Sequence, residues 1–113
     1  MRSEISNLME QEVSEKEWEA IRKSPKEYKG KVVRWKCTFF CERSYDLLPY
    51  VGPLFMSVFH VNGNLSFPVI VFGTLGFRVS KGDLFLITGK FDSVTRDGKI
   101  MLIPIKIERL GRG

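Results

Sequence analysis

From Gly30 onward, turn-forming residues divide the chain into five short segments rich in apolar residues. In the first, KVVRWKCTFFCE (31–42), Val33, Trp35, Cys37 and Phe39 share one side, which is the two-residue period of a β-strand. We predict four further strands, over 54–61, 65–72, 82–91 and 99–110. Asn62-Gly63-Asn64 and Asp97-Gly98 are hairpin signals, because Asn and Gly tolerate positive φ. Segment 73–82 contains three glycines and favours an irregular connection over a helix.

The strand count favours a closed sheet, because short strands in a small domain remove their unpaired edges by closing on themselves. We therefore predict an all-β fold with an N-terminal helix, built as a five-stranded barrel. A chain of 113 residues makes one domain with its own core and needs no metal or disulfide. Its predicted parts are an acidic arm (1–13), a helix (14–24) and the barrel (28–110).

The predicted helix has recognisable ends. Ser14 and Glu17 form a capping box, and Ser24 before Pro25 is pushed out of the helical region. Trp18, Ala20 and Ile21 are its apolar residues. Residues 3–12 are compatible either with another helical turn or with a loose arm.

The charge is uneven along the chain. Residues 1–19 contain two basic residues and six glutamates, a charge of −4. Because the net charge of the chain is +5, the remaining residues carry +9. A basic body favours polyanionic partners such as nucleic acids. An N-terminus without an apolar signal segment, and apolar runs too short to cross a bilayer, predict a cytoplasmic protein. Cys37 and Cys41 on one strand are about 13 Å apart, too far for a disulfide, which predicts buried free thiols.

Three segments resemble the OB-fold, in particular archaeal replication-protein-A-like and tRNA-anticodon-like domains. They are YKGKVVRWKCTFF (28–40), KGDLFLITGKF (81–91) and KIMLIPIKIERL (99–110). The likeness covers most of the chain, although no helix is evident between the third and fourth strands. It implies a ligand surface on the second and third strands, bordered by the first loop and the loop between strands four and five.

The resemblance also assigns the faces of the fourth strand. Phe85 and Ile87 face the core, Gly89 supplies a kink, and Leu84, Leu86 and Thr88 point outward. Trp18 and Ile21 are the candidates to cover that outward face, unless the helix plugs the barrel instead. If they pack elsewhere, Leu84 and Leu86 contribute to a protein interface. On the fifth strand, the alternation places Met101, Ile103, Ile105 and Ile107 on one face.

Aromatic rings that stack on bases and cations that meet phosphates characterise single-strand binding sites. The expected surface supplies both: Arg34, Lys36, Arg43, Tyr45, Tyr50, Phe55, Phe59, Lys90, Arg96 and Lys99. Trp35 is assigned to the core. On the second strand, either Phe55 and Phe59 or Met56 and Val58 form the core face, and the alternation leaves both open.

Catalytic and metal-binding constellations are not evident in the sequence. His60 is the single histidine, Asp83 and Asp92 occupy turn positions, and there is no phosphate loop or zinc pattern. We therefore expect no enzyme activity, no cofactor and no metal.

The sequence predicts a protein that binds single-stranded DNA or RNA with little sequence preference. The alternative is an OB-fold that binds protein, as a subunit of a larger complex or as a homodimer, through Leu84, Leu86 or the N-terminal arm.

Overall fold

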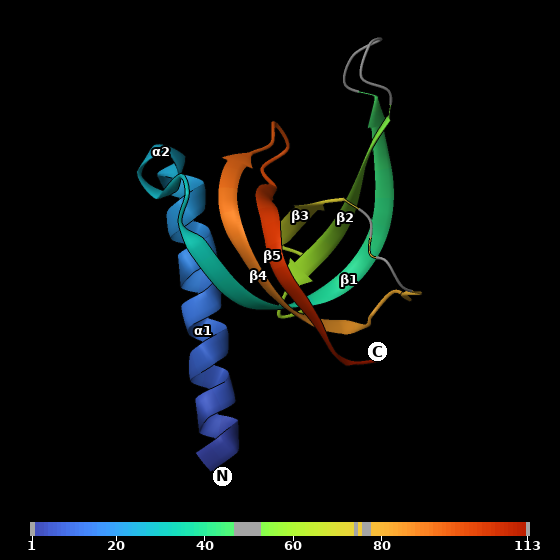
Figure 1. Cartoon of the computed structure of the whole chain (residues 1–113). Helices are drawn as coiled ribbons and strands as arrows, with labels where there is room; N and C mark the ends of the chain where they lie inside the picture. The colour runs from blue at the N-terminus through green and yellow to red at the C-terminus, as the bar shows by residue number, and fades with distance from the viewer. Residues whose placement is uncertain (1, 47–52, 74, 76–77, 113) are drawn as a thin grey trace.

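The computed structural model describes residues 2–46, 53–73, 75 and 78–112. Two helices, α1 (Arg2–Lys23) and α2 (Pro25–Tyr28), precede five strands (Figure 1). The strands are β1 (Val32–Asp46), β2 (Pro53–Val61), β3 (Pro68–Phe72), β4 (Leu84–Val94) and β5 (Ile100–Gly111). The fold is mostly β with an N-terminal helix, as predicted, and the described residues between β3 and β4 contain no helix.

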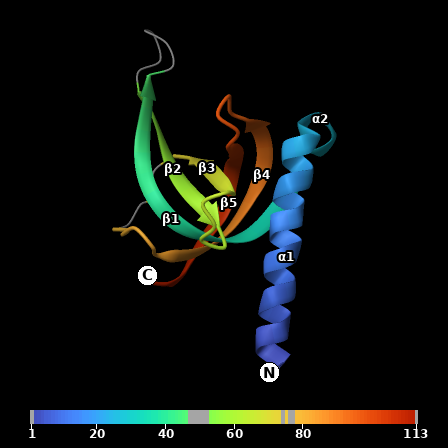
Figure 2. The same cartoon turned by 180° about the vertical axis from the view of Figure 1, so that it is seen from behind.

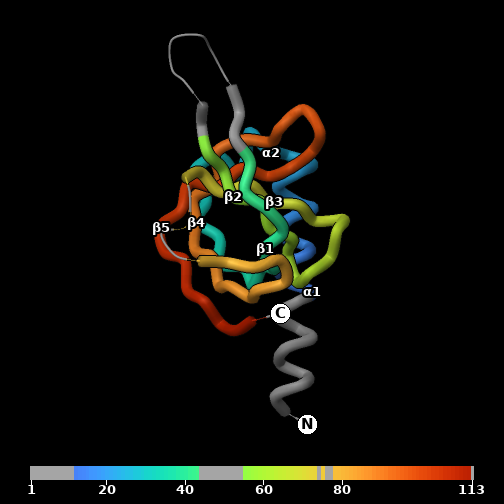
Figure 3. Tube along the Cα trace, turned by 90° about the vertical axis from the view of Figure 1, so that its right-hand side faces the viewer, coloured from blue at the N-terminus to red at the C-terminus, as the bar shows by residue number. Residues whose placement is uncertain are grey.

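All five strands belong to one sheet that closes into a ring, in the order β1-β2-β3-β5-β4 (Figure 3). Pairing of β1 with β4 closes the ring, and β3 with β5 is its single parallel pair among the described strands. The turn after β2 takes its expected form, with Asn62 and Gly63 at φ 55° and 70°. Closure gives each described strand two neighbours, which satisfies the edge hydrogen-bonding groups.

The main core fills the inside of the ring. It includes Trp35, Phe59, Phe85 and Phe91, all fully or almost fully buried. The ring of Phe59 meets that of Phe85 edge-on, with centroids 5.7 Å apart. Trp35 is therefore a core residue, as predicted.

Helix α1 lies beside the sheet and adds two side chains to this core. Trp18 and Ile21 belong to the core cluster, and the Trp18 indole donates a hydrogen bond to the Pro68 carbonyl at 3.1 Å. The Trp18 ring also packs edge-on against Phe67, with centroids 5.1 Å apart. The helix runs past the start of β1 (Figure 2). The helix thus contributes to the core inside the ring. Of the two predicted alternatives, packing of Trp18 and Ile21 on the outward face of Leu84 and Leu86 was wrong, and packing of the helix against the inner core agrees with the structure.

The start of the helix also differs from the prediction. α1 begins at Arg2 and passes through Ser14, so Ser14 is not an N-cap but a buried residue inside the helix. The capping pattern does not mark the start of a helix here, because the residues before Ser14 are already helical. The predicted end was correct: α1 stops at Lys23, and Ser24 is non-helical at φ −134°.

Strand β1 is longer than predicted, and it contains a bulge. Phe39 pairs with Phe59, but the next pair joins Cys41 to Val58, which leaves Phe40 as an extra residue. The strand continues to Asp46, beyond the predicted end at residue 42, while β3 is shorter than predicted and begins at Pro68. Cys37, before the bulge, faces the core, whereas the bulge places Cys41 on the outer side. Both thiols are free, as predicted, although only Cys37 is fully buried.

The predicted apolar face of β5 was wrong, and a second bulge explains why. Thr88 pairs with Lys106 and Gly89 with Pro104, so Ile105 is an extra residue on β5. Before the bulge Ile100 and Leu102 point inward, and after it Ile107 packs against the core. Ile103 and Ile105 are instead exposed.

Strand β4 has the predicted inward face, since Phe85 and Ile87 are fully buried. Leu84 is exposed, and Leu86 and Thr88 are partly exposed, on the outward face. Gly89 lies at the register shift opposite β5, as expected for a kink.

Candidate nucleic-acid interface

A second cluster of apolar residues lies on the outside of the ring. Met56, Val58 and Ile70 are buried together, yet they alternate along β2 and β3 with residues of the inner core. Four partly buried residues pack against them. We call the whole set the outer strip: Phe40, Cys41, Met56, Val58, Ile70, Phe72 and Met101.

The strand register arranges the outer strip in rows across the sheet. Cys41, Val58, Ile70 and Met101 are paired in turn, so one row crosses β1, β2, β3 and β5. A second row contains Arg43, Met56 and Phe72. Arg43 is exposed, which places a cation beside the apolar strip.

A third row combines an aromatic ring with basic residues. The Phe40 ring lies 4.9 Å from the His60 ring, tilted by 58°. The Lys81 ammonium lies over the Phe40 ring, 4.8 Å from its centroid. His60 pairs with Pro68 of β3, and Lys99 comes directly before Ile100, which pairs with Val69. Lys81 and Lys99 therefore flank Phe40 and His60 from the two sides of the strip.

The environment of His60 disfavours its charged form. Burial lowers the pKa of the imidazole, and the positive charges of Lys99 and Lys81 lower it further. Only 9% of the residue is exposed.

Lys99 is held by the turn between β4 and β5. Its ammonium forms an ion pair with Asp97, and its backbone N–H donates to Thr95 Oγ1 at 2.9 Å. The hydrogen bond from Lys99 holds the pKa of the Asp97 carboxyl below its usual value. Arg96 is exposed in the same turn. The turn thus places two basic residues at the side of the ring where β5 begins.

Three other predicted cations lie on a different part of the outer surface. Arg34, Lys36 and Lys90 lie on β1 and β4, where Arg34 pairs with Thr88 and Lys36 with Leu86. Lys90 pairs with Val32 on one side and Ile103 on the other. The structure does not bring these residues together with the outer strip.

The two predicted phenylalanines differ in solvent exposure. Phe59 is fully buried inside the ring, so its assignment to ligand binding was wrong. Phe55 is 51% exposed because it lies beyond the end of the β2–β3 pairing, which stops at Met56. Both faces of β2 are buried further along, Phe59 inside and Met56 with Val58 outside, so neither predicted pair alone is the core face.

Of the two predicted tyrosines, the structure describes only the backbone of Tyr45. Tyr45 pairs with Leu54 through the β1 backbone, and its side chain lies outside the described part of the structure. Tyr50 lies wholly outside the described residues.

Sequence reasoning missed Phe40, Phe72 and Lys81 and treated His60 as structural. One signal was present: Phe39-Phe40-Cys41 breaks the alternation of the first strand, and such a break is typical of a bulge. Lys81 had no comparable signal, since its place beside Phe40 depends on how the loop before β4 folds back.

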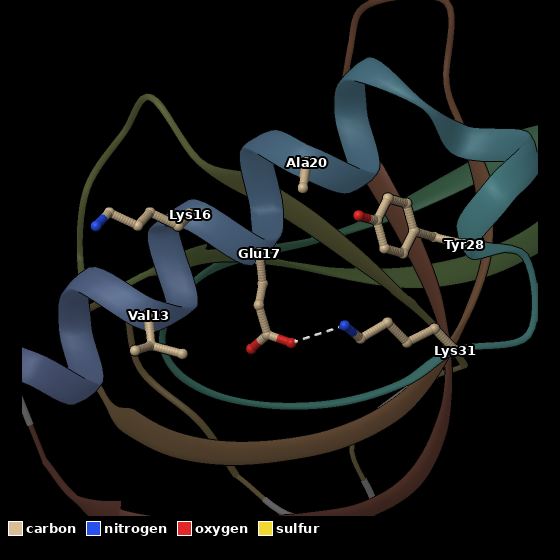
Figure 4. A pocket seen from close by; sticks show the side chains of 6 residues that line it. All are labelled: Val13, Lys16, Glu17, Ala20, Tyr28 and Lys31. Atoms are coloured by element: carbon tan, nitrogen blue, oxygen red, sulfur yellow. Dashed lines mark ion pairs between the residues drawn. The ribbon is translucent and has the colours of Figure 1, made fainter.

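A cavity of about 280 Å³ lies elsewhere, between α1, α2 and the start of β1 (Figure 4). Glu17 and Lys31 form an ion pair across it at 3.2 Å, and the Trp35 indole donates to Glu17 at 3.4 Å. None of the predicted site residues lines it. Its polar groups serve to join α1 to β1.

Within the described ranges, no group of three or more His, Cys, Asp or Glu residues is placed to hold a metal ion. No helix in that part of the chain is long and apolar enough to span a membrane. Comparison with protein families, with curated proteins and with solved structures found no match to this chain.

Proposed function

We propose that the chain is an OB-fold barrel that binds single-stranded DNA or RNA, with little sequence preference, across the outer strip. The OB-fold assignment is supported by the ring order β1-β2-β3-β5-β4 together with the resemblance of three sequence segments. In this proposal the protein binds its ligand and does not transform it.

The observation that carries the proposal is the combination of rings and cations on the outer strip. Phe40 and Phe72 lie at opposite ends of an apolar strip, with Lys81 and Lys99 at one end and Arg43 at the other. Single-strand binding sites use this combination, because bases stack on rings while cations follow the phosphates. A base that stacks on Phe40 would displace the Lys81 ammonium from the face of that ring. The displaced ammonium would then contact a phosphate.

The test is fluorescence anisotropy of labelled oligo-dT and oligo-rU at low salt, with wild-type protein and Phe40→Leu. We expect Phe40→Leu to weaken binding about fivefold or more, since stacking on one ring contributes about 1–3 kcal/mol. Phe55→Leu is the matched control, because that ring is exposed away from the strip, and it should bind like wild type. Failure of the wild-type protein to bind either strand at high micromolar concentration would refute the proposal.

A protein-binding role is the second candidate, favoured by a different surface. Val32, Leu84, Ile103 and Ile105 are all exposed, and Val32 and Ile103 both flank Lys90 across three neighbouring strands. Leu84 belongs to the surface predicted for this role, whereas Leu86 is only partly exposed. An apolar partner would cover these side chains.

A further inference from the structure

We infer that His60, Lys81 and Lys99 form one binding site for a phosphate group of the nucleic-acid backbone. The inference deepens the proposed function and rests on it for the identity of the ligand. In this site a phosphate is held at the Phe40 end of the outer strip, and its binding depends on pH.

The geometry of the third row supports a shared site. Phe40 contacts both His60 and the Lys81 ammonium, so these two basic groups lie around one ring. Lys99 approaches from the other side, next to the strand that pairs with β3. Because His60 is 9% exposed, a phosphate would contact one edge of its imidazole and meet the two ammonium groups from outside.

Phosphate suits this set of donors better than a single neutral acceptor would. Its oxygens can accept from the imidazole and from two ammonium groups at once, and charge-assisted bonds of this kind are the stronger ones. Asp97 is the competing anion, since it already pairs with Lys99. A bound phosphate would therefore share Lys99 with Asp97 or displace it.

The charges around His60 couple phosphate binding to protonation. In the free protein, burial and the charges of Lys99 and Lys81 lower the pKa of His60, which leaves the imidazole mainly neutral at pH 7. Asp97 lies against Lys99, and Asp83 of the loop before β4 pairs with Arg109 at 3.2 Å. A phosphate beside the ring adds a negative charge there and raises the pKa. By linkage, affinity must then rise as the pH falls.

The test uses the fact that His60 is the single histidine, so its NMR signal is unambiguous. The chemical shift of its ring is titrated from pH 8 to 5 in the free protein and with saturating oligo-dT. We expect a higher pKa in the complex, and each unit of that rise corresponds to up to about tenfold tighter binding at low pH. Lys81→Gln and Lys99→Gln should reduce the rise, whereas Lys90→Gln, on the other surface, should not.

The affinity itself supplies the second measurement. Binding of oligo-dT should tighten between pH 7.5 and 5.5 in the wild type, and most of that change should be lost in His60→Gln. An unchanged or lower His60 pKa in a complex that does form would overturn the phosphate site and leave the proposed function intact. If no oligonucleotide binds, the proposed function fails, and the same titration with tripolyphosphate decides the site: a rise in pKa supports it and no rise overturns it.

Discussion

Position 89 leaves almost no room for a side chain. A Cβ added to Gly89 would lie 3.1 Å from Leu102 Cβ and 3.2 Å from the Ile103 carbonyl oxygen. The neighbours are a core side chain and a backbone atom on β5, so neither can move away easily. Glycine lets β4 and β5 approach each other where the register shifts.

Gly89→Ala should destabilise the fold by about 1–3 kcal/mol, because an extra methyl group in a packed core forces its surroundings to shift. Gly111→Ala is the matched control, since a Cβ there has nothing within 4 Å. Urea unfolding of both variants measures the difference. Equal stability of the two would show that the close approach at Gly89 is not a packing constraint.

Phe40 shows how a single extra residue can create a surface. Without the bulge, the alternation of β1 would place Cys41 with Cys37 and Phe39 on the inside of the ring. With it, Phe40, Cys41 and Arg43 all join the outer strip or its border. The bulge therefore brings Cys41 and Arg43 to the outer surface beside Phe40, which already faces outward by the alternation of β1.

Helix α1 forms part of the core of the closed sheet. Trp18 packs against Phe67 and bonds to Pro68, while Arg22 lies against Gly98 in the turn between β4 and β5. The helix thereby contacts segments that lie about 50 residues or more further along the chain. Its acidic side chain Glu17 links to Lys31 and Trp35 in the same region.

Trp18→Ala should cost about 3–5 kcal/mol of unfolding free energy, as expected for removing a large buried aromatic residue. Val13→Ala, in the same helix but at an exposed position, should change stability by less than about 0.5 kcal/mol. Thermal and urea unfolding of the two variants test this. A mild effect of Trp18→Ala would mean that the closed sheet holds its core without the helix.

The molecule has two candidate binding surfaces. The outer strip combines rings with cations, whereas the β1–β4–β5 surface combines exposed aliphatic residues with Arg34, Lys36 and Lys90. The two differ in how binding responds to salt. Nucleic-acid binding releases counterions, while an apolar protein interface is nearly insensitive to salt.

Oligo-dT affinity should fall with salt at a log–log slope of about −0.7 per phosphate contacted. Two phosphates, one at His60, Lys81 and Lys99 and one at Arg43, give a slope of about −1.4, or roughly sevenfold weaker binding for a fourfold rise in salt. Anisotropy titrations from 50 to 200 mM salt measure it. A flat salt response would contradict phosphate binding and direct attention to the aliphatic surface around Ile103 and Ile105.

Local patterns alone were enough to predict much of the fold. The alternation of 31–39, the Asn62-Gly63 turn and the break at Ser24-Pro25 predicted a strand, a hairpin and a helix end that the structure contains. The same patterns predicted the inward face of β4 and the core position of Trp35. Each of these depends on residues close in sequence, whose backbone preferences and spacing act locally.

The candidate site was far less predictable, because it depends on register. Arg43 and Lys99 border the outer strip, but Phe59 is in the core, and Phe40, Lys81 and His60 joined the site only in the structure. Extra residues such as Phe40 in β1 and Ile105 in β5 change which of the following side chains face outward, and no local pattern marks both shifts. Local patterns were sufficient to predict the type and order of most elements and the basic charge of the body. The bulges and the closure of the ring decided which residues share a surface, because those are set by pairing between distant segments.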